Sequence, residues 1–404
     1  MKNKEKGITL IALIITIIVM LILVGVVVTV VIQSNLLGTT KTAGDKYKTA
    51  YEEESNMSEV TINGEKYASI EDYIESTKPL PEIKAGERAS EKSKYQTAVI
   101  PKGFTVSNAT GEKDVSTGLV IYDIPEDKLE NVKWDGTEKT EYNQFVWIPV
   151  EVNKTTEPKD TETSIASFYR SNWSNNARST NLTESTDYTE PSTENDTATG
   201  IASQIANLTE SIYKYGGFYI GRYEAGSETE RKSSSGKTAI GIKQDMYPYN
   251  FVKWGESMSN IGTEGAVYLS NSLYNSTKPN YGATSMLCTG ACWDSMLDFI
   301  KNTKNVTSSA DWGNYSDAEF DITRGKYVVV SNDTLGNFQN VSNEYPKAKN
   351  TCVLLTTGAT ERNSAKNIYD VAGNCFEWTT ESHSSASRVY RGRLLLQPWL
   401  LHSS

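Results

Sequence analysis

The chain has 404 residues, 38% of them hydrophobic, which is enough for a substantial core in two domains or in one domain with large insertions. Its formal net charge of −10, with no basic patch after Lys6, argues against nucleic acid as a partner. Two histidines and four cysteines, with no Cys-x-x-Cys pair, argue against a zinc site of the usual kind.

An uncharged, apolar run extends from Ile8 to Ile32. As a helix it would be long enough to cross a hydrocarbon core of about 30 Å. Lys2, Lys4 and Lys6 precede it, and the positive-inside rule places this end in the cytoplasm. We therefore predict a single membrane span with the remaining chain outside. A cleaved secretory signal has a shorter apolar core, and a buried helix would need protein on every face.

The junction from Lys6 to Ile11 resembles the leader of type IV pilins and pseudopilins. In that family a peptidase on the cytoplasmic face cuts after the glycine, so the resemblance implies cleavage between Gly7 and Ile8 and a leader of residues 1–7. The family usually has a glutamate five residues after the cut, whereas this chain has Ala12. That departure counts against assembly into a long filament.

Composition divides the rest of the chain into three regions. Residues 8–58 are expected to form a transmembrane and stalk helix, and residues 59–94 a spacer and linker that contains an Asn-Gly turn. Residues 95–404 carry short apolar strands and predict an outer domain. Within it, residues 153–210 are rich in Ser, Thr, Asn and Glu, and we interpret them as a mobile surface insertion. The strands are expected at 98–100, 104–106, 119–122, 145–150 and 216–224.

Five short segments, in order and approximate spacing, resemble the formylglycine-generating enzyme (sulfatase-modifying factor) family: 216–224, 249–254, 287–294, 368–379 and 388–392. That family has an irregular fold related to C-type lectins, with loops anchored by aromatic side chains. Such a fold suits the 23 tyrosines and 8 tryptophans of this chain. The resemblance implies structural roles for seven motif residues: Trp147, Trp254, Trp293, Gly373, Trp378, Arg391 and Gly392.

The fold class expected from these features is α+β. A long N-terminal transmembrane and stalk helix would be followed by an irregular C-type lectin-like domain, truncated at its C-terminus. After Gly392 the family continues with Gly-Ser and aromatic residues, whereas this chain reads Arg-Leu-Leu-Leu-Gln-Pro from Arg393 to Pro398. Those residues can be encoded so that a reading frame shifted by one base gives Gly-Ser-Tyr-Tyr-Ser. We therefore predict a frameshift that removes the final strands.

Two groups of candidate site residues each allow more than one interpretation. Cys288 and Cys292 stand at the start of an amphipathic helix predicted over 291–302, and they are either buried thiols or a disulfide, with a metal site third. Glu377 is either a buried structural carboxylate or, with Asn374, an oxygen ligand of Ca²⁺, which the family can bind.

The function follows from what the family's enzyme needs. It oxidises a substrate cysteine with two cysteines placed after its Arg-Gly-Gly-Ser-Trp-like strand, and this chain has no cysteine after Cys375. The resemblance therefore implies no catalytic residue, and we expect a cell-surface, pilin-like protein that displays a non-catalytic ligand-binding domain. A pilus structural or assembly subunit and a relative of the enzyme are the alternatives. The expected partners are the membrane, a prepilin peptidase, other pilins, and a protein or glycan ligand.

Overall fold

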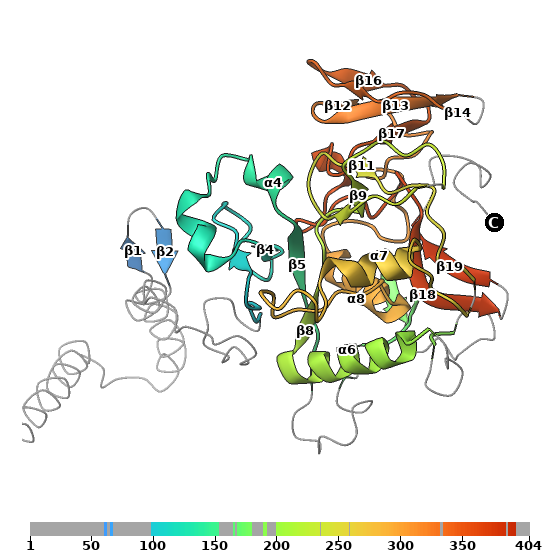
Figure 1. Cartoon of the computed structure of the whole chain (residues 1–404). Coiled ribbons are helices and arrows are strands. Elements are labelled where there is room, and N and C mark those ends of the chain that lie inside the picture. Colours follow the sequence, from blue (N-terminus) through green and yellow to red (C-terminus); the bar gives the residue numbers. More distant parts are fainter. Residues whose placement is uncertain are drawn as a thin grey trace, which may run out of the picture. The chain divides into compact units, whose positions relative to one another are not determined.

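The computed structural model describes most of the chain beyond residue 97 (Figure 1). Its described residues are 60–62, 65–67, 98–152, 165, 168–179, 189–191, 199–234, 236–257, 259–331, 334–384 and 387–392. The apolar run Ile8–Ile32, the Gly7-Ile8 junction and the tail 393–404 lie outside these residues.

The chain divides into two compact units, Met1–Pro79 and Leu80–Ser404. In the first unit the structure describes a hairpin of β1 (Val60–Ile62) and β2 (Glu65–Tyr67). The two strands are antiparallel, and Ile62 pairs with Glu65. The hairpin lies in the segment that the sequence analysis assigned to a spacer.

The second unit contains a four-stranded antiparallel sheet in the order β3-β4-β5-β8. Its strands are β3 (Thr105–Val106), β4 (Val120–Tyr122), β5 (Gln144–Pro149) and β8 (Gly217–Gly221). β-Branched and aromatic residues dominate them, and successive side chains point to opposite faces. Four of the predicted strands are confirmed, with changed ends, whereas residues 98–100 form no strand.

Four α-helices lie in the described residues: α4 (Glu138–Glu141), α6 (Ile201–Tyr215), α7 (Ala266–Leu273) and α8 (Gly290–Ile300). Helix α8 confirms the predicted amphipathic helix. It begins after Thr289, whose hydroxyl oxygen accepts a hydrogen bond from the Cys292 N–H at 3.0 Å. Helix α6 ends at Tyr215 and is followed by Gly216, whose φ of 77° places it in the left-handed region common at helix C-termini. Residues 201–210, which were expected to belong to a mobile surface insertion, therefore form the first part of this helix.

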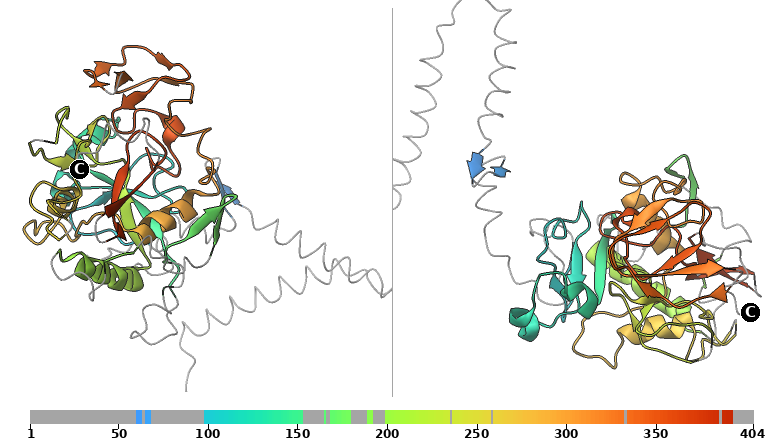
Figure 2. Two further views of the ribbon diagram at one scale, coloured as in Figure 1. Left: turned by 90° about the vertical axis from the view of Figure 1, so that its right-hand side faces the viewer. Right: turned by 90° about the horizontal axis from the view of Figure 1, so that it is seen from above.

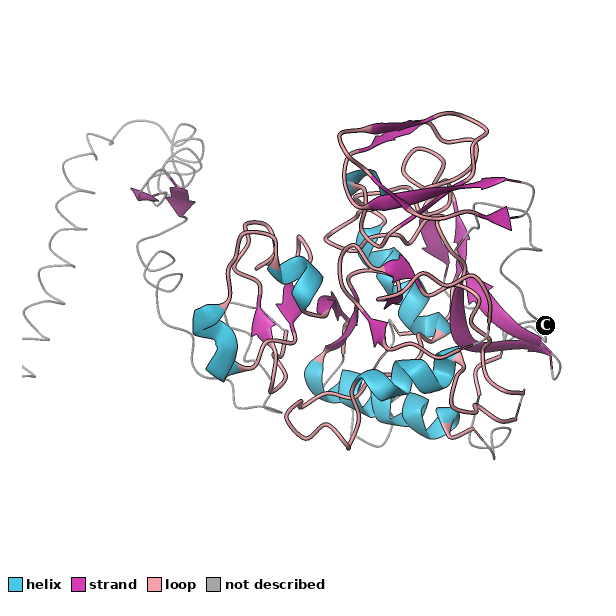
Figure 3. Ribbon diagram, turned by 45° about the horizontal axis from the view of Figure 1, so that its top comes forward, coloured by secondary structure: helices cyan, strands magenta, loops and turns pink. Residues whose placement is uncertain are grey.

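The remaining strands form small sheets (Figure 3). β9 (Gly226–Ser227) lies between β10 (Ile240–Gly241) and β11 (Tyr247–Pro248), and β6 (Asn172–Ser174) pairs with β7 (Ala177–Ser179). β18 (Glu377–Ser384) pairs with β19 (Ser387–Arg391). Two 3-10 turns complete the order, η1 (Glu126–Asn131) and η2 (Glu361–Asn363).

Six further strands gather at one end of the second unit, and we call them the outer strands (Figures 1 and 2). β12 (Phe320–Ile322) pairs with β16 (Tyr345–Lys347). β13 (Lys326–Ser331) pairs with β14 (Thr334–Leu335), β15 (Gln339–Asn340) and β17 (Val353–Leu355).

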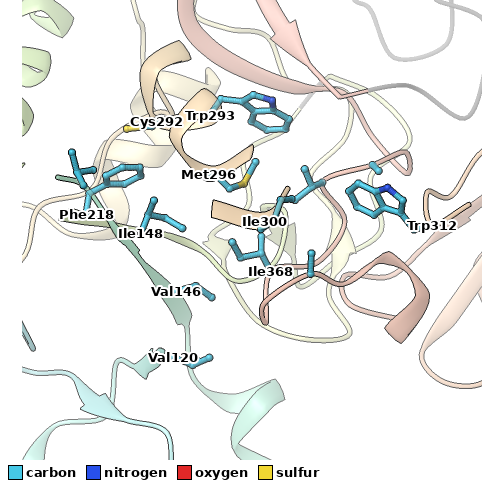
Figure 4. Close-up of a cluster of buried hydrophobic side chains, with 14 of the residues drawn as sticks. Val120, Val146, Ile148, Phe218, Cys292, Trp293, Met296, Ile300, Trp312 and Ile368 are labelled. Atoms are coloured by element: carbon cyan, nitrogen blue, oxygen red, sulfur yellow. The ribbon is translucent and has the colours of Figure 1, made fainter. Parts of the chain in front are cut away.

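The main core lies between α8 and one face of the central sheet (Figure 4). Met296 and Ile300 of the helix are almost fully buried there, together with Val146 and Ile148 of β5. Trp147, whose side chain points to the opposite face of β5, belongs to a second cluster. The two faces of one strand thus anchor two cores, which explains why β5 reads as an almost continuous apolar run.

The expected α+β class with a long N-terminal transmembrane helix and a C-type lectin-like domain is wrong. The described residues fold mostly into short strands in small sheets, and their longest helix, α6, has 15 residues. None of their helices is long and apolar enough to cross a membrane. Turns separate the short strands. Most of the described non-glycine residues with positive φ are Asn or Asp, which adopt this turn conformation more readily than other side chains.

Candidate functional site

A buried group of charged side chains connects α8 to the β18–β19 hairpin, and we call it the Glu381 cluster. Glu381 is fully buried on β18. The Arg391 guanidinium of β19 donates to both of its carboxylate oxygens, at 2.8 and 2.9 Å. Arg170 Nη1 lies 2.5 Å from Glu381 Oε1. Such paired, charge-assisted hydrogen bonds compensate a carboxylate that has lost its water.

Asp294 of α8 is the second carboxylate of the Glu381 cluster. It is fully buried, and it accepts hydrogen bonds from the Ser171 N–H at 2.7 Å and from Trp173 Nε1 at 3.2 Å. Arg170 and Arg391 each lie 3.7 Å from it. The segment 170–173, which composition assigned to a mobile insertion, is therefore bound to the core through α8.

One residue that the sequence analysis named, Arg391, belongs to this cluster, beside residues that the sequence analysis missed. Arg391 was expected to be structural, and its contacts agree with that role. Glu381, Asp294 and Arg170 were not singled out. A signal existed for Asp294, because it stands beside Trp293 on the apolar face of the predicted helix, where a charge needs partners.

Asn374 is fully buried at the centre of a second group, the Asn374 cluster, which also contains Glu224, Asp370 and Glu377. The Asn374 Oδ1 accepts hydrogen bonds from the Leu355 N–H at 2.9 Å and from Asn314 Nδ2 at 3.2 Å. Its Nδ2 donates to a Glu224 carboxylate oxygen and to the Leu355 carbonyl. Every polar atom of this amide thus has a protein partner.

The Asn374 cluster contains three carboxyl groups, of which Glu224 and Asp370 are buried and Glu377 is partly buried. Burial raises the pKa of Asp370 to about 7. Burial, with the nearby Asp370, raises the pKa of Glu377 to about 8. The pKa of Glu224 is raised by burial first and then by Asp370 and Glu377. Asp370 Oδ2 accepts from the Gly358 N–H at 2.7 Å, while its Oδ1 has no hydrogen-bond partner among the described residues.

The Asn374 cluster contains Asn374 and Glu377, the two residues predicted to bind Ca²⁺. Calcium takes six to eight oxygen ligands, and the Asn374 oxygen already accepts two hydrogen bonds from the protein. The part of the chain that the structure describes holds no group of three or more His, Cys, Asp or Glu residues that could bind a metal ion. The oxygen atoms of this cluster therefore do not provide the ligands that Ca²⁺ needs.

All four cysteines are free thiols in the structure, Cys288 and Cys292 included. Cys292 is buried, and Cys288 is partly buried. Burial raises the pKa of the Cys292 thiol to about 12 and that of Cys288 and Cys375 well above its usual range. These groups are therefore thiols and not thiolates at neutral pH, which makes them weak nucleophiles.

The motif tryptophans and glycine hold loops in place. Trp254 Nε1 donates to the Thr379 carbonyl at 2.9 Å, and Trp378 Nε1 donates to the Val252 carbonyl at 2.9 Å, so the two segments exchange hydrogen bonds. Trp293 lies in the main core and Trp147 in the second. Gly373 has a φ of 85°, and a Cβ there would lie 2.1 Å from the Asn314 carbonyl oxygen.

A different kind of surface lies on the outer strands, where apolar side chains stay partly exposed. Tyr327 of β13 and Tyr345 of β16 stack with ring centroids 3.9 Å apart and an interplanar angle of 26°. We call them the tyrosine pair. Phe320, Val329 and Val341 are partly buried in the same cluster. The Tyr327 hydroxyl donates to Gln339 Oε1 at 3.2 Å, and both Gln339 and Asn340 are exposed.

Comparisons of the chain with models of known families, with curated proteins and with solved structures found no match. The fold therefore defines only a broad class, a mainly β domain built from small sheets. Its chemistry has to be inferred from the side chains themselves.

Proposed function

We propose that the chain displays a non-catalytic ligand-binding domain, of the adhesin or receptor kind, at a cell surface. The tyrosine pair is the observation that carries the proposal. Partly exposed aromatic rings that stack between two small sheets, with amide groups beside them, are suited to recognition, because they combine apolar area with adaptable hydrogen bonds. The location at a cell surface rests on the sequence alone, because residues 8–32 lie outside the part of the chain that the structure describes.

The state of the buried carboxylates, the Asn374 amide and the thiols supports binding rather than catalysis. The carboxylates of the Glu381 cluster are bound to arginines of the same chain. The Asn374 amide is saturated by its neighbours. The buried thiols hold their protons. The polar atoms of these three sets of groups are thus engaged within the fold, whereas Asp370 Oδ1 has no hydrogen-bond partner among the described residues.

A glycan is the ligand class that fits the tyrosine pair best. A sugar ring offers an apolar face of C–H groups to an aromatic ring, and hydroxyl groups at its edge to amides such as Gln339 and Asn340. The outer strands combine these two features, because Gln339 of β15 pairs with Tyr327 of β13 and the Tyr345 ring of β16 stacks on Tyr327.

Glycan and protein arrays probed with the full chain test the proposal. The wild type is compared with Tyr345→Ser, which removes one ring of the tyrosine pair. The matched control is Tyr268→Ser, because Tyr268 is also partly exposed but lies on α7, beside Lys237. We expect glycan signals that Tyr345→Ser loses and Tyr268→Ser keeps. Signals on protein spots only, or no loss in Tyr345→Ser, would refute the glycan assignment.

A further inference from the structure

The apolar cluster that holds the tyrosine pair continues along β12 to Phe320 (Figure 1). Tyr345 of β16 pairs with Ile322, and Lys347 pairs with Phe320. Because alternate residues of a strand share a face, Phe320 and Tyr345 lie on the same face of this two-stranded sheet, in diagonal positions. Diagonal neighbours on two antiparallel strands are about 7–8 Å apart. The partly exposed Phe320 ring therefore lies one position beyond the tyrosine pair.

A guanidinium group lies over the Phe320 ring. It belongs to Arg362 of η2, and its central carbon is 5.2 Å from the centre of the ring. Within the described part of the chain it makes one hydrogen bond, from Nη2 to the Ala310 carbonyl at 3.0 Å. An arginine side chain has five N–H donors, so this contact fixes the guanidinium and leaves donors for a ligand.

Lys304 brings a second positive charge to the same place. Its ammonium donates to the Arg362 carbonyl at 3.2 Å and lies 5.8 Å from the centre of the Trp312 ring. Both cations are partly exposed, and neither forms an ion pair with a carboxylate of the described residues. Asp311, which is exposed, is the acidic residue whose charge reaches Arg362 without such a pair. In a chain with a net charge of −10, two neighbouring cations without ion pairs favour a bound anion.

A structural role accounts for only part of this arrangement. Lys304 follows the end of α8, where the last carbonyl groups of a helix favour a positive charge. Arg362 comes from η2, and the end of α8 does not require it. Lys347 also lies over the Phe320 ring, at 5.5 Å, but it is fully buried and donates to two backbone carbonyls. Of these two cations over Phe320, Arg362 is therefore the one that a ligand can contact.

We propose that the glycan bound at the tyrosine pair carries an acidic group, a carboxylate or a sulfate ester, that binds Arg362 with Lys304 beside it. The inference rests on the proposed function. A sugar unit stacked on the tyrosine pair leaves a neighbouring unit within reach of Phe320, and an acidic group on that unit meets the guanidinium. The planar guanidinium matches the paired oxygen atoms of such anions, and charge-assisted hydrogen bonds are stronger than those between neutral groups.

Arrays probed with the full chain test the inference with printed glycans in matched pairs. One set compares glucose with glucuronate at the same position of a glycan, and the other compares a free hydroxyl with its sulfate ester. Calorimetric titration with the best pair then gives the ratio of the two affinities, which we call the acidic preference. We expect the wild type to bind the acidic member about tenfold more tightly or better. Raising NaCl from about 50 to 500 mM should lower this preference, because salt screens charges.

The variant Arg362→Gln removes the charge and keeps a polar side chain. Its matched control is Lys366→Gln, because Lys366 is also partly exposed and lies 4.1 Å from the centre of an aromatic ring, that of Phe299, outside the cluster of the tyrosine pair. We expect Arg362→Gln to abolish the acidic preference while the neutral member still binds, and Lys366→Gln to keep it. Lys304→Gln, as a second variant, should lower the preference in part.

The outcomes separate this inference from the proposed function. Equal wild-type affinity for both members of a pair, with both lost in Tyr345→Ser, would overturn the acidic group and leave the glycan site standing. A preference that Arg362→Gln retains would overturn the assigned residue. If Arg362→Gln lowers the thermal midpoint, the wild-type salt titration decides, and a preference independent of NaCl would overturn the inference. Glycan binding that Tyr345→Ser does not weaken, or no glycan binding, would instead refute the proposed function.

Discussion

The substitution Asp370→Asn should stabilise the protein at neutral and alkaline pH. Asp370 is almost fully buried, and its pKa is raised from 3.8 to about 7 by that burial. The unfolded chain loses this proton in mild acid while the folded chain keeps it, so the wild type loses stability as the pH rises through this window. A shift of about three pKa units corresponds to roughly 4 kcal/mol, and shared protonation with Glu224 and Glu377 brings the expected gain to about 1–4 kcal/mol.

The replacement keeps the geometry of the site. An asparagine oxygen can accept from the Gly358 N–H as Asp370 does, and Asn tolerates the positive φ of 62° at this position. The assay is chemical denaturation of both proteins from about pH 4 to pH 9, with the free energies of unfolding compared at each pH. The two curves should meet near pH 4 and separate above it.

A control separates charge from backbone preference. Asp245 also has a positive φ, of 61°, so Asp245→Asn makes the same chemical change in the same backbone conformation. A constant offset between Asp370→Asn and wild type at every pH would refute the reasoning, because it would place the effect in the backbone or in packing and not in the buried carboxyl group.

Three further predictions test other parts of the molecule. Arg391→Lys should lower the free energy of unfolding by about 1–3 kcal/mol, because lysine cannot make both contacts to Glu381; an unchanged denaturation midpoint would show that the Glu381 cluster does not need the paired contact. Gly373→Ala should destabilise the protein more than Gly111→Ala, since both glycines have positive φ but only the first would place a Cβ against backbone, and equal losses of thermal midpoint would count against the clash. Gly7→Ala, expressed with a prepilin peptidase, should leave a protein about seven residues longer than the wild type, whereas identical N-termini by mass spectrometry would exclude cleavage at Gly7.

Local patterns were enough to predict the elements that build the main core. The spacing of Trp293, Met296 and Ile300 predicted α8, and the runs of β-branched and aromatic residues predicted the central strands. Helix α6 was missed because residues 153–210 were judged together by their high content of polar residues. Its apolar residues Ile201, Ile205, Leu208 and Ile212 nevertheless recur at helical spacing.

The buried charge clusters could not be predicted in the same way. Asp294 and its partner Ser171 are 123 residues apart in the sequence, and nothing in either local pattern indicates the other. Asn374 was assigned a role only as a Ca²⁺ ligand together with Glu377, whereas the structure gives its amide four hydrogen bonds to protein groups.

The central claim is that the tyrosine pair on the outer strands binds a glycan. Calorimetric titration with a glycan selected on the array tests it most directly, using wild type, Tyr345→Ser and Tyr268→Ser that have equal thermal midpoints. We predict that Tyr345→Ser weakens binding by about tenfold or more, consistent with the loss of one stacking ring, and that Tyr268→Ser binds as the wild type does. Equal affinity in all three proteins would contradict the claim.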